Sequence, residues 1–409
     1  MNRLYLKNNF EILLIIVGTV LYIPLWNNGF SVSAGDDDWM LYNNPYVYSL
    51  DLDTISTYFT RFYSGQYSPL NTLLYGIIYY YIGMDAFAYH LMSLVLHILN
   101  SVLVFKIVEE LTSRDGTRLY LRRESFVPFL TALLFLIHPI QVESVVWISA
   151  SKIVLYSFFL FCGLLSYIRY VRKLKTSLLI WSLLFFVLGF GAKEQIVVFP
   201  FLLILLDYFF DRSFRTKKMV LEKLPFLILA GVFCLVSLFA QQEGFSNKLE
   251  NEYYPFFERT ILATYAFSEY LFKIFLPIKL SYWYSFPMEP GSPLPLKYYF
   301  YPLFIVSFFY FIFTLVKKDK QINLYILFGL MFFIINIFLT LHIVPMARGV
   351  FMADRYVYVG SIGLFFIFSQ LIEKYVLDNL SRQKFIALII YLFGLFIYTF
   401  WYIDYWNYI

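Results

Sequence analysis

The sequence predicts an all-α, polytopic membrane protein. Of its 409 residues, 60% are hydrophobic and 14% are charged, and the mean hydropathy is +0.68. A soluble domain carries about 25% charged residues, so this chain lacks the polar surface that a water-soluble fold needs. Its hydrophobic residues also gather in runs that approach the length of a bilayer-spanning helix, about 20 residues.

Eleven apolar runs are predicted as membrane-spanning helices of a single domain over residues 1–409, with no soluble domain appended. Some of the connections between them are short, and Pro or charged residues mark several of the breaks. The predicted spans are 10–29, 89–110, 126–138, 152–171, 177–191, 195–210, 224–240, 298–316, 322–341, 356–373 and 384–402.

The first run has a second interpretation, as a cleaved signal peptide. Arg3 and Lys7 form a basic start, and Val32-Ser33-Ala34 has the small residues of a cleavage site. However, the apolar stretch from Phe10 to Leu25 is longer than the 7–15 residues typical of a signal peptide's apolar region. Its length favours a retained membrane helix.

Lys and Arg predict the orientation. With the N-terminus in the cytoplasm, 22 of the 32 Lys and Arg residues fall on the cytoplasmic side, as the positive-inside rule requires. An odd number of spans then places the C-terminus outside. Two long outer segments, 30–88 and 241–297, are rich in Tyr and Phe. Short amphipathic helices are expected there, for instance over 260–277.

Three adjacent acids, Asp36, Asp37 and Asp38, follow the first run. Acids are costly inside hydrocarbon, so carboxylates at a membrane boundary point to a function. Crowded carboxylates raise one another's pKa, which suits proton transfer near neutral pH. The triplet is therefore a candidate general base. The alternative is a solvated loop that anchors the helix end.

A second outer cluster holds His138, Glu143 and Lys152, which surround the turn at Pro139, where the third span is expected to end. Glu143 and Lys152 are nine residues apart, which separates them by about 180° on a continuous helix. No pairing between them is therefore expected. The alternative is a capped turn with a buried histidine.

A third outer cluster, Lys193 and Glu194, lies in a charged break between two apolar runs. A lysine there is suited to holding a phosphate as a point charge. The alternative is an ordinary polar loop.

A fourth outer cluster consists of Arg348 and the run from Asp354 and Arg355 to Tyr356. Arginine suits bidentate phosphate contact, and we expect Asp354 to orient Arg355 by ion pairing. The alternative is interfacial anchoring by Arg and Tyr.

Several common sites are missing from the sequence. It has no P-loop, no Gly-rich dinucleotide turn and no His-Glu-x-x-His pair. With four histidines, no metal site is expected; His90 and His97 predict interhelical hydrogen bonds. The basic residues lie in short runs between apolar segments, which argues against a nucleic-acid partner.

The four clusters fall on one side of the predicted topology, because an even number of spans separates each from the next. Two clusters hold candidate bases and three hold cations. A base that deprotonates an acceptor, with cations that stabilise a leaving phosphate, suits transfer of a group from a membrane lipid phosphate.

Seven short sequence motifs, spread over most of the chain, occur in an order that is typical of a known family. They are Asp36-Asp37 with Asn43-Asn44-Pro45; Tyr67-Ser68-Pro69-Leu70; His90-Leu91 to Leu99-Asn100-Ser101; His138-Pro139 with Glu143; Lys193-Glu194-Gln195; Pro277 to Ser281; and Ala353-Asp354-Arg355-Tyr356-Val357-Tyr358. In these the chain resembles the GT-C superfamily of polyprenyl-phosphate-sugar glycosyltransferases. It looks most like the membrane region of transmembrane-and-TPR-containing O-mannosyltransferases and their bacterial relatives.

The resemblance implies a GT-C fold of about eleven spans and an inverting hexosyltransferase acting on the periplasmic face of a bacterial inner membrane. It implies a polyprenyl-phosphate-linked sugar as the donor. No cofactor and no metal-ligand residues are expected, while metal dependence stays open, although a monophosphate donor has less need of a cation than a diphosphate. The implied roles are a base for Asp36 or Asp37, a catalytic carboxylate for Glu143, donor phosphate binding for Lys152, Lys193, Arg348 and Arg355, and support for Asp38, His138, Glu194, Asp354 and Tyr356.

Two departures from the family matter. The family often has an Arg where this chain has Lys152, which keeps the charge but loses the forked geometry. The TPR region is missing, so the acceptor stays open between a protein hydroxyl and a cell-envelope glycan or lipid.

Two other classes stay open. A polysaccharide polymerase or ligase would use lipid-diphosphate glycans and depend on Arg in the large loops. A lipid-linked sugar flippase or transporter would be expected to have broken helices, mid-membrane ionisable residues and repeated halves. Here the ionisable residues gather at span ends and no repeat is visible.

Overall fold

The structure is a computed structural model that is nearly all helical. It describes residues 2–31, 36–113, 125–245, 254–289, 291–316, 320–343, 350–377 and 382–406, and these contain no strand, only two isolated β-bridges. The prediction of an all-α protein is therefore confirmed. The α-helices are α1 (Asn2–Leu21), α2 (Leu52–Thr60), α3 (Pro69–Ile82), α4 (Ala86–Thr112), α5 (Phe126–Ile137), α6 (Val142–Val146), α7 (Ser151–Lys173), α8 (Thr176–Ala192), α9 (Phe199–Phe209), α10 (Lys217–Phe245), α11 (Phe256–Phe275), α12 (Tyr301–Val316), α13 (Lys320–Ile337), α14 (Ser361–Ile372) and α15 (Arg382–Tyr405).

Each of the eleven predicted spans overlaps one of these helices, although the bounds differ. Six helical stretches of the described residues are long and apolar enough to cross a membrane, and a seventh is added if the bent pair of α5 with Pro139–Val146 counts as one span. Two further apolar helical stretches are shorter: Asn9–Leu21 within α1, and α8. The structure thus supports a multi-pass membrane protein, while the number eleven stays a prediction.

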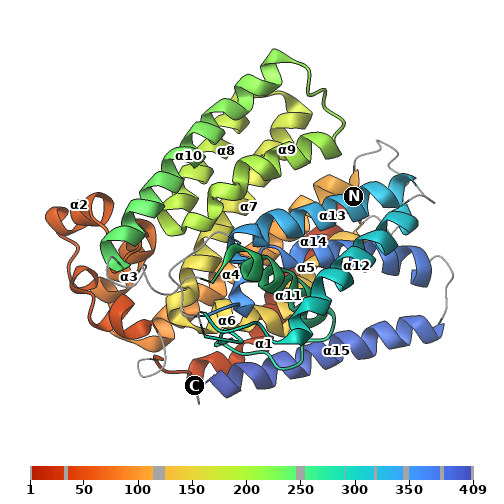
Figure 1. Cartoon of the computed structure of the whole chain (residues 1–409). Coiled ribbons are helices and arrows are strands. Elements are labelled where there is room, and N and C mark those ends of the chain that lie inside the picture. Colours follow the sequence, from red (N-terminus) through yellow and green to blue (C-terminus); the bar gives the residue numbers. More distant parts are fainter. Residues whose placement is uncertain are drawn as a thin grey trace.

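The helices form two groups joined through α7 (Figure 1). On one side α8 and α9 pack against α7, and α10 packs against α8 and α9. On the other side α4, α5, α13 and α14 form the centre of the molecule, and α15 runs along its edge against α1 and α5. One continuous hydrophobic core, from Leu14 in α1 to Trp406 after α15, runs through both groups.

A close backbone approach fixes α13 against α14. A Cβ on Gly363 would lie 2.2 Å from the carbonyl oxygen of Gly329, and a Cβ on Gly329 would lie 2.5 Å from that of Gly363. Only glycine fits at both positions. Small residues that let two helices approach closely are common where helices pack in membranes.

The first outer segment folds around a small core of its own. Met40 and Leu41 pack with Val47, Tyr75 and Tyr89, and Ile148 from the turn before α7 completes the cluster. The segment begins with a short π-helical stretch, Asp38–Tyr42, and continues through α2 and α3. The acids at its start are therefore held on a folded unit and not on a loose loop.

The second outer segment contains the helix expected over 260–277, which the structure places at Phe256–Phe275 as α11. One face of α11 is buried, with Ile261, Ala266 and Tyr270 among its residues. An isolated bridge between Tyr284 and Met352 ties the rest of the segment to the chain before Asp354. The segment is thereby fastened beside the candidate site.

Candidate functional site

The segment between α5 and α7 is the centre of the site. Pro139 follows the end of α5, and the chain bends by 55° there. The imidazole Nδ1 of His138 accepts a hydrogen bond from the backbone N–H of Ile140 at 3.2 Å and so caps the short turn. His138 thus lies in a capped turn as a buried histidine, which is the geometry that the alternative interpretation expected.

Glu143, in α6, is buried and joined to Arg355. The backbone N–H of Arg355 donates to Glu143 Oε2 at 2.6 Å, and its guanidinium Nη1 forms an ion pair with Oε1. The guanidinium also lies 4.9 Å from the centre of the Trp147 ring, within the range of a cation–π interaction. Arg355 is thus held by partners from the α5–α7 segment.

This arrangement corrects one expectation. Asp354 does not orient Arg355 by ion pairing: its carboxylate accepts hydrogen bonds from Tyr284 Oη at 2.8 Å and from the backbone N–H of Ser281 at 3.2 Å. The physical reason is that Asp354 and Arg355 are adjacent in a short 3₁₀ turn, so their side chains leave the chain in different directions. Asp354 binds the second outer segment, and Arg355 binds α6.

Burial strongly affects the proton affinity of Asp354. It is almost completely buried, and this burial, together with the negative charge of Glu143, raises its pKa from 3.8 to about 8. The positive charge of Lys273 and the hydrogen bond from Tyr284 oppose the shift. The shift favours the protonated form of Asp354 more than is usual for an aspartate.

Asp37 anchors the first outer segment to the turn before α7. Its side chain is 1% exposed, and Oδ1 accepts hydrogen bonds from both the backbone N–H, at 2.9 Å, and the hydroxyl of Ser149. Oδ2 accepts from the backbone N–H of Ser31 at 2.9 Å. Burial raises the pKa of Asp37, although the hydrogen bonds from Ser149 and Ser31 oppose it. Both carboxylate oxygens are therefore occupied.

Asp36 is more accessible than Asp37. It is half-buried, and its Oδ1 accepts a hydrogen bond from the indole N–H of Trp39 at 3.0 Å. No hydrogen bond to Oδ2 is recorded from any described residue. Asp38, by contrast, accepts from the side chain of Asn43 at 2.7 Å within its own turn. The three acids thus have three different environments.

Lys152 and Lys193 bring positive charge to the same place. Lys152 is buried in the first turn of α7 and donates to Gln66 Oε1 at 2.7 Å. Its electrostatic neighbours are Lys193, Asp36, Glu194 and Arg355. Lys193 Nζ lies 3.8 Å from Glu194. Lys193, Arg355 and the accessible carboxylate of Asp36 therefore all lie within electrostatic range of Lys152, and Asp36 also lies within range of Arg355.

The position of Lys193 depends on a glycine. A Cβ on Gly191 would lie 2.9 Å from the side chain of Leu70 in α3. The absence of a side chain lets the end of α8 come close to the first outer segment. Lys193, which follows two residues later, is thereby brought to the site.

The other predicted residues have separate positions. Tyr356 is buried with its ring 5.1 Å from the Arg355 guanidinium. Arg348 lies outside the described residues. His97 of α4 bonds to Leu136 of α5, as the prediction of interhelical hydrogen bonds requires, and also to Tyr358, whereas His90 bonds to Gly29, which lies outside the helices. No group of three His, Cys, Asp or Glu side chains among the described residues is placed to hold a metal ion.

Comparison with known proteins found no relative of this chain. No protein-family model matches the chain, and no match was found among curated protein sequences. The geometry of the site therefore has to carry the functional argument.

A second charged cluster lies near the opposite end of α7. Asp207 pairs with Arg212 at 2.9 Å and with Lys223 at 2.5 Å, and Glu222 pairs with Arg212 at 2.9 Å. Tyr167 Oη donates to Asp207 at 2.7 Å. Two acids and two cations pair with one another here, and the cluster joins α7, α9 and α10.

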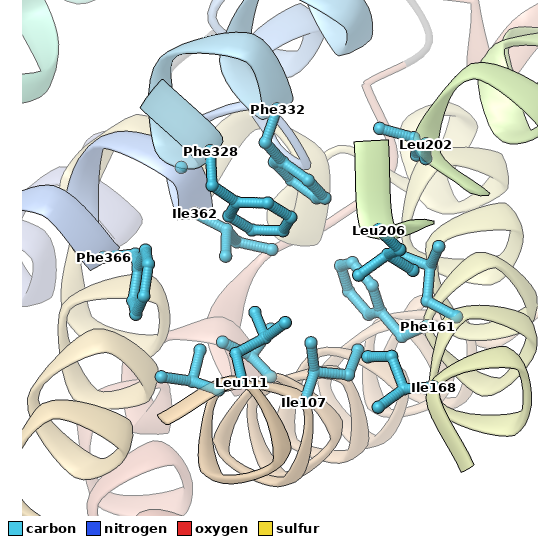
Figure 2. A pocket seen from close by; sticks show the side chains of 14 residues that line it. Ile107, Leu111, Phe161, Ile168, Leu202, Leu206, Phe328, Phe332, Ile362 and Phe366 are labelled. Atoms are coloured by element: carbon cyan, nitrogen blue, oxygen red, sulfur yellow. The ribbon is translucent and has the colours of Figure 1, made fainter. Parts of the chain in front are cut away.

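An apolar hollow of about 490 Å³, including the open space at its mouth, lies between α4, α7, α9, α13 and α14. Figure 2 shows the side chains of Leu111, Phe161 and Phe328 around it. All fourteen lining residues are hydrophobic or glycine. Leu111 and Ile168 place it toward the ends of α4 and α7 that lie away from Lys152. Such a lining suits an apolar chain and no charged group.

Sequence patterns missed the residues that hold the site together. Ser149 binds Asp37, Trp39 binds Asp36, and Gln66 binds Lys152. Serine, glutamine and tryptophan carry no signal of their own in a single sequence. The one available clue is that Trp39 directly follows the acidic triplet.

Proposed function

We propose that this protein is an inverting glycosyltransferase that moves a sugar from a polyprenyl-phosphate donor to an acceptor hydroxyl on the non-cytoplasmic side of a membrane. The observation that carries the proposal is the grouping of Asp36 with Lys152, Lys193 and Arg355 at one end of the helices. An accessible carboxylate beside several cations is what such a transfer requires.

The geometry favours Asp36 over Asp37 as the base. A general base must reach the acceptor proton, and Asp36 is half-buried with one oxygen bonded to Trp39. Asp37 is buried, with both oxygens accepting hydrogen bonds from the protein. We therefore assign Asp37 to positioning: it holds the backbone of Asp36 against Ser149.

The cations divide into two kinds. Arg355 is already paired with Glu143, so Glu143 positions Arg355 and is not itself a second base. The ammonium group of Lys152 donates to the side-chain amide of Gln66 and to the thioether of Met40. No carboxylate among the described residues lies within salt-bridge distance of it. Lys152 is the side chain best suited to meet an incoming phosphate as a point charge.

The proposed reaction is a single displacement. The Asp36 carboxylate takes the proton of the acceptor hydroxyl while the acceptor oxygen forms a bond to the anomeric carbon of the sugar. The bond from that carbon to the phosphate oxygen breaks, and the phosphate leaves with the electron pair. Lys152, Lys193 and Arg355 stabilise the charge that builds on the phosphate. The new bond forms opposite to the one that breaks, so the anomeric configuration inverts.

Membrane geometry supports the site's location. Lys152 and Arg172 are at opposite ends of α7, a separation of about 30 Å at 1.5 Å per residue. Arg172 and Arg169 pair with Glu110 near the end of α4, in the part of the chain that the positive-inside rule assigns to the cytoplasm. The Lys152 end of α7, where the site lies, then faces the non-cytoplasmic side of the membrane. A lipid-linked sugar exposed on that side could reach the site.

The direct test is transfer by the purified full-length protein in proteoliposomes. We would supply polyprenyl monophosphate carrying a radiolabelled sugar, with membrane extract as the source of acceptor, and determine the anomeric configuration of the product. Label transferred with inversion supports the proposal. Transfer only from lipid-diphosphate glycans would indicate a polymerase or ligase, and movement of label across the vesicle without transfer would indicate a flippase.

A further inference from the structure

A hollow in the first outer segment adjoins the candidate site. It is an open hollow with about 440 Å³ of empty space, a volume that includes the solvent at its mouth. Aromatic residues, Trp39, Tyr46 and Tyr63 among them, line it together with hydroxyl, amide and guanidinium groups. It differs completely from the apolar hollow among the helices.

Two lining residues connect the hollow to the charged residues. Trp39 donates its indole N–H to Asp36, and Gln66 accepts from Lys152. A ligand in the hollow would therefore sit one side chain away from both the proposed base and a proposed phosphate-binding lysine.

A tight turn builds one wall of the hollow. Tyr63 and Gln66 exchange two backbone hydrogen bonds of 3.0 Å across Ser64-Gly65. Both turn residues have positive φ, 47° and 73°, as a two-residue hairpin of type I′ requires. The turn holds Tyr63 and Gln66 at neighbouring positions on the lining.

The aromatic rings form a connected wall. The ring of Tyr63 lies 6.2 Å from that of Trp39 and 5.6 Å from that of Tyr46. Tyr63 Oη donates to the backbone of Asn43, which fixes the ring. Rigid aromatic faces of this kind suit the flat C–H face of a sugar ring, because that face is apolar while the ring's edge carries hydroxyls.

Polar groups with unused capacity complete the lining. Arg61 is exposed; its backbone N–H donates to Thr57, but no hydrogen bond or ion pair joins its guanidinium to a described residue. Ser68 occupies the N-cap position of α3, yet its hydroxyl makes no cap hydrogen bond. Both can donate to sugar hydroxyls. The mixture of rings, hydroxyls and a guanidinium matches a pyranose better than an extended peptide, which would need a row of paired backbone groups.

We propose that this hollow binds a pyranose ring of one of the two substrates, resting on the proposed glycosyl transfer. The ring belongs either to the donor, with its phosphate toward Lys152, or to a glycan acceptor, with a hydroxyl toward Asp36. The chemistry of recognition is the same for both.

Binding can be measured without transfer. We would use saturation-transfer NMR with methyl pyranosides on the full-length protein in nanodiscs and compare Tyr46→Ala with Tyr80→Ala. Tyr46 lines the hollow, whereas Tyr80 is an exposed α3 residue outside it. We expect saturation transfer in the wild type and in Tyr80→Ala. In Tyr46→Ala we expect weaker binding, with a dissociation constant about tenfold higher.

Arg61→Gln provides a second variant, because the Arg61 guanidinium has no recorded partner among the described residues whose loss would affect folding. We expect it to weaken binding as well. Absence of binding to the wild type, or equal binding by all variants, would overturn the inference. Binding of short peptides in the hollow without binding of pyranosides would also overturn the inference, and it would assign the hollow to a peptide.

Transfer kinetics distinguish the two sources of the ring. A higher KM for the lipid-linked donor alone in Arg61→Gln assigns the ring to the donor, and a higher KM for the acceptor alone assigns it to the acceptor. Unchanged KM values for both substrates would contradict the inference. If pyranosides bind in the expected pattern but the wild type transfers no sugar, the proposed function fails while the binding site stands.

Discussion

Glu143 and Arg355 are 212 positions apart in the chain, yet the backbone N–H and the guanidinium of Arg355 both donate to the Glu143 carboxylate. The side chain of Glu143 is 1% exposed and that of Arg355 is 16% exposed. This pair joins the bend after α5 to the turn before α14. It therefore sets the position of Arg355 at the proposed site.

Breaking this pair is expected to destabilise the protein. Glu143→Gln leaves the Arg355 charge without its partner, and loss of one member of a buried pair costs about 3–5 kcal/mol. The free energy of unfolding in mixed detergent micelles measures the effect. In the double variant Glu143→Gln/Arg355→Met, the loss should be smaller than the sum of the two single losses.

Glu11→Gln is the matched control. Glu11 pairs with Lys106 at 3.6 Å, with both side chains partly exposed, and such pairs contribute about 0–1 kcal/mol. An equal loss in Glu11→Gln and Glu143→Gln would contradict the positioning role of Glu143.

Asp37→Asn is expected to lower stability together with activity. Three protein donors reach the two oxygens of Asp37, and an amide keeps only one oxygen. An unsatisfied buried donor costs about 1–3 kcal/mol. Ser149→Ala, which keeps the backbone N–H, should lose about 1 kcal/mol. The same unfolding measurement applies, and wild-type stability of Asp37→Asn would show that Asp37 is not an anchor.

Stability should fall as the pH rises from about 4 to about 8, because of Asp354. Its pKa is about 8 in the folded protein and near 3.8 in a free chain, so in this window the unfolded chain releases a proton that the folded protein keeps. The unfolded state then binds fewer protons, which lowers the free energy of unfolding as pH increases. Above pH 8 this contribution is lost in full.

Asp354→Asn should flatten that profile, because an amide does not titrate. Unfolding midpoints at pH 5, 6, 7 and 8 for the wild type and the variant compare the two slopes. Lys273, Tyr284 and Glu143, which face Asp354, are present in both proteins, so the comparison isolates the removal of the Asp354 carboxyl. Identical slopes would mean that Asp354 is ionised in the folded state.

Gly363→Ala is expected to separate α13 from α14. The added methyl group would lie 2.2 Å from a backbone oxygen, and backbone cannot rotate away as a side chain does. Overpacking typically costs about 1–3 kcal/mol. Gly394→Ala in α15 is the control, because nothing lies within 4 Å of its added Cβ; alanine should be neutral or stabilising there. Equal thermal unfolding midpoints for the two variants would contradict the close approach.

The positions of the helices were predictable because apolar runs and their breaks are written directly in the sequence. Pro139 and the Gly191–Glu194 break marked real ends of helices. The lengths were less predictable: the run 10–29 became α1 to Leu21 followed by a 3₁₀ turn, since Pro24 removes a backbone donor. Hydropathy alone does not reveal where a helix ends because a proline lacks a backbone N–H.

The charged residues of the site were predictable, but their partners were not. Acids and cations at the ends of apolar runs stand out because they are expensive there. Which charge meets which depends on the packing of distant segments. Arg355 accordingly pairs with Glu143 and not with its neighbour Asp354. The different roles of Asp36 and Asp37 likewise depend on Ser149, which a single sequence does not mark.

The most direct test of the central claim, that Asp36 is the base, is the transfer rate of Asp36→Asn with labelled polyprenyl-phosphate sugar. Asp53→Asn, an exposed acid of the same outer segment, is the charge-matched control. We expect Asp36→Asn to lose about 10²–10⁴-fold in rate with unchanged stability, while Asp53→Asn keeps the wild-type rate. A wild-type rate in Asp36→Asn would contradict the assignment.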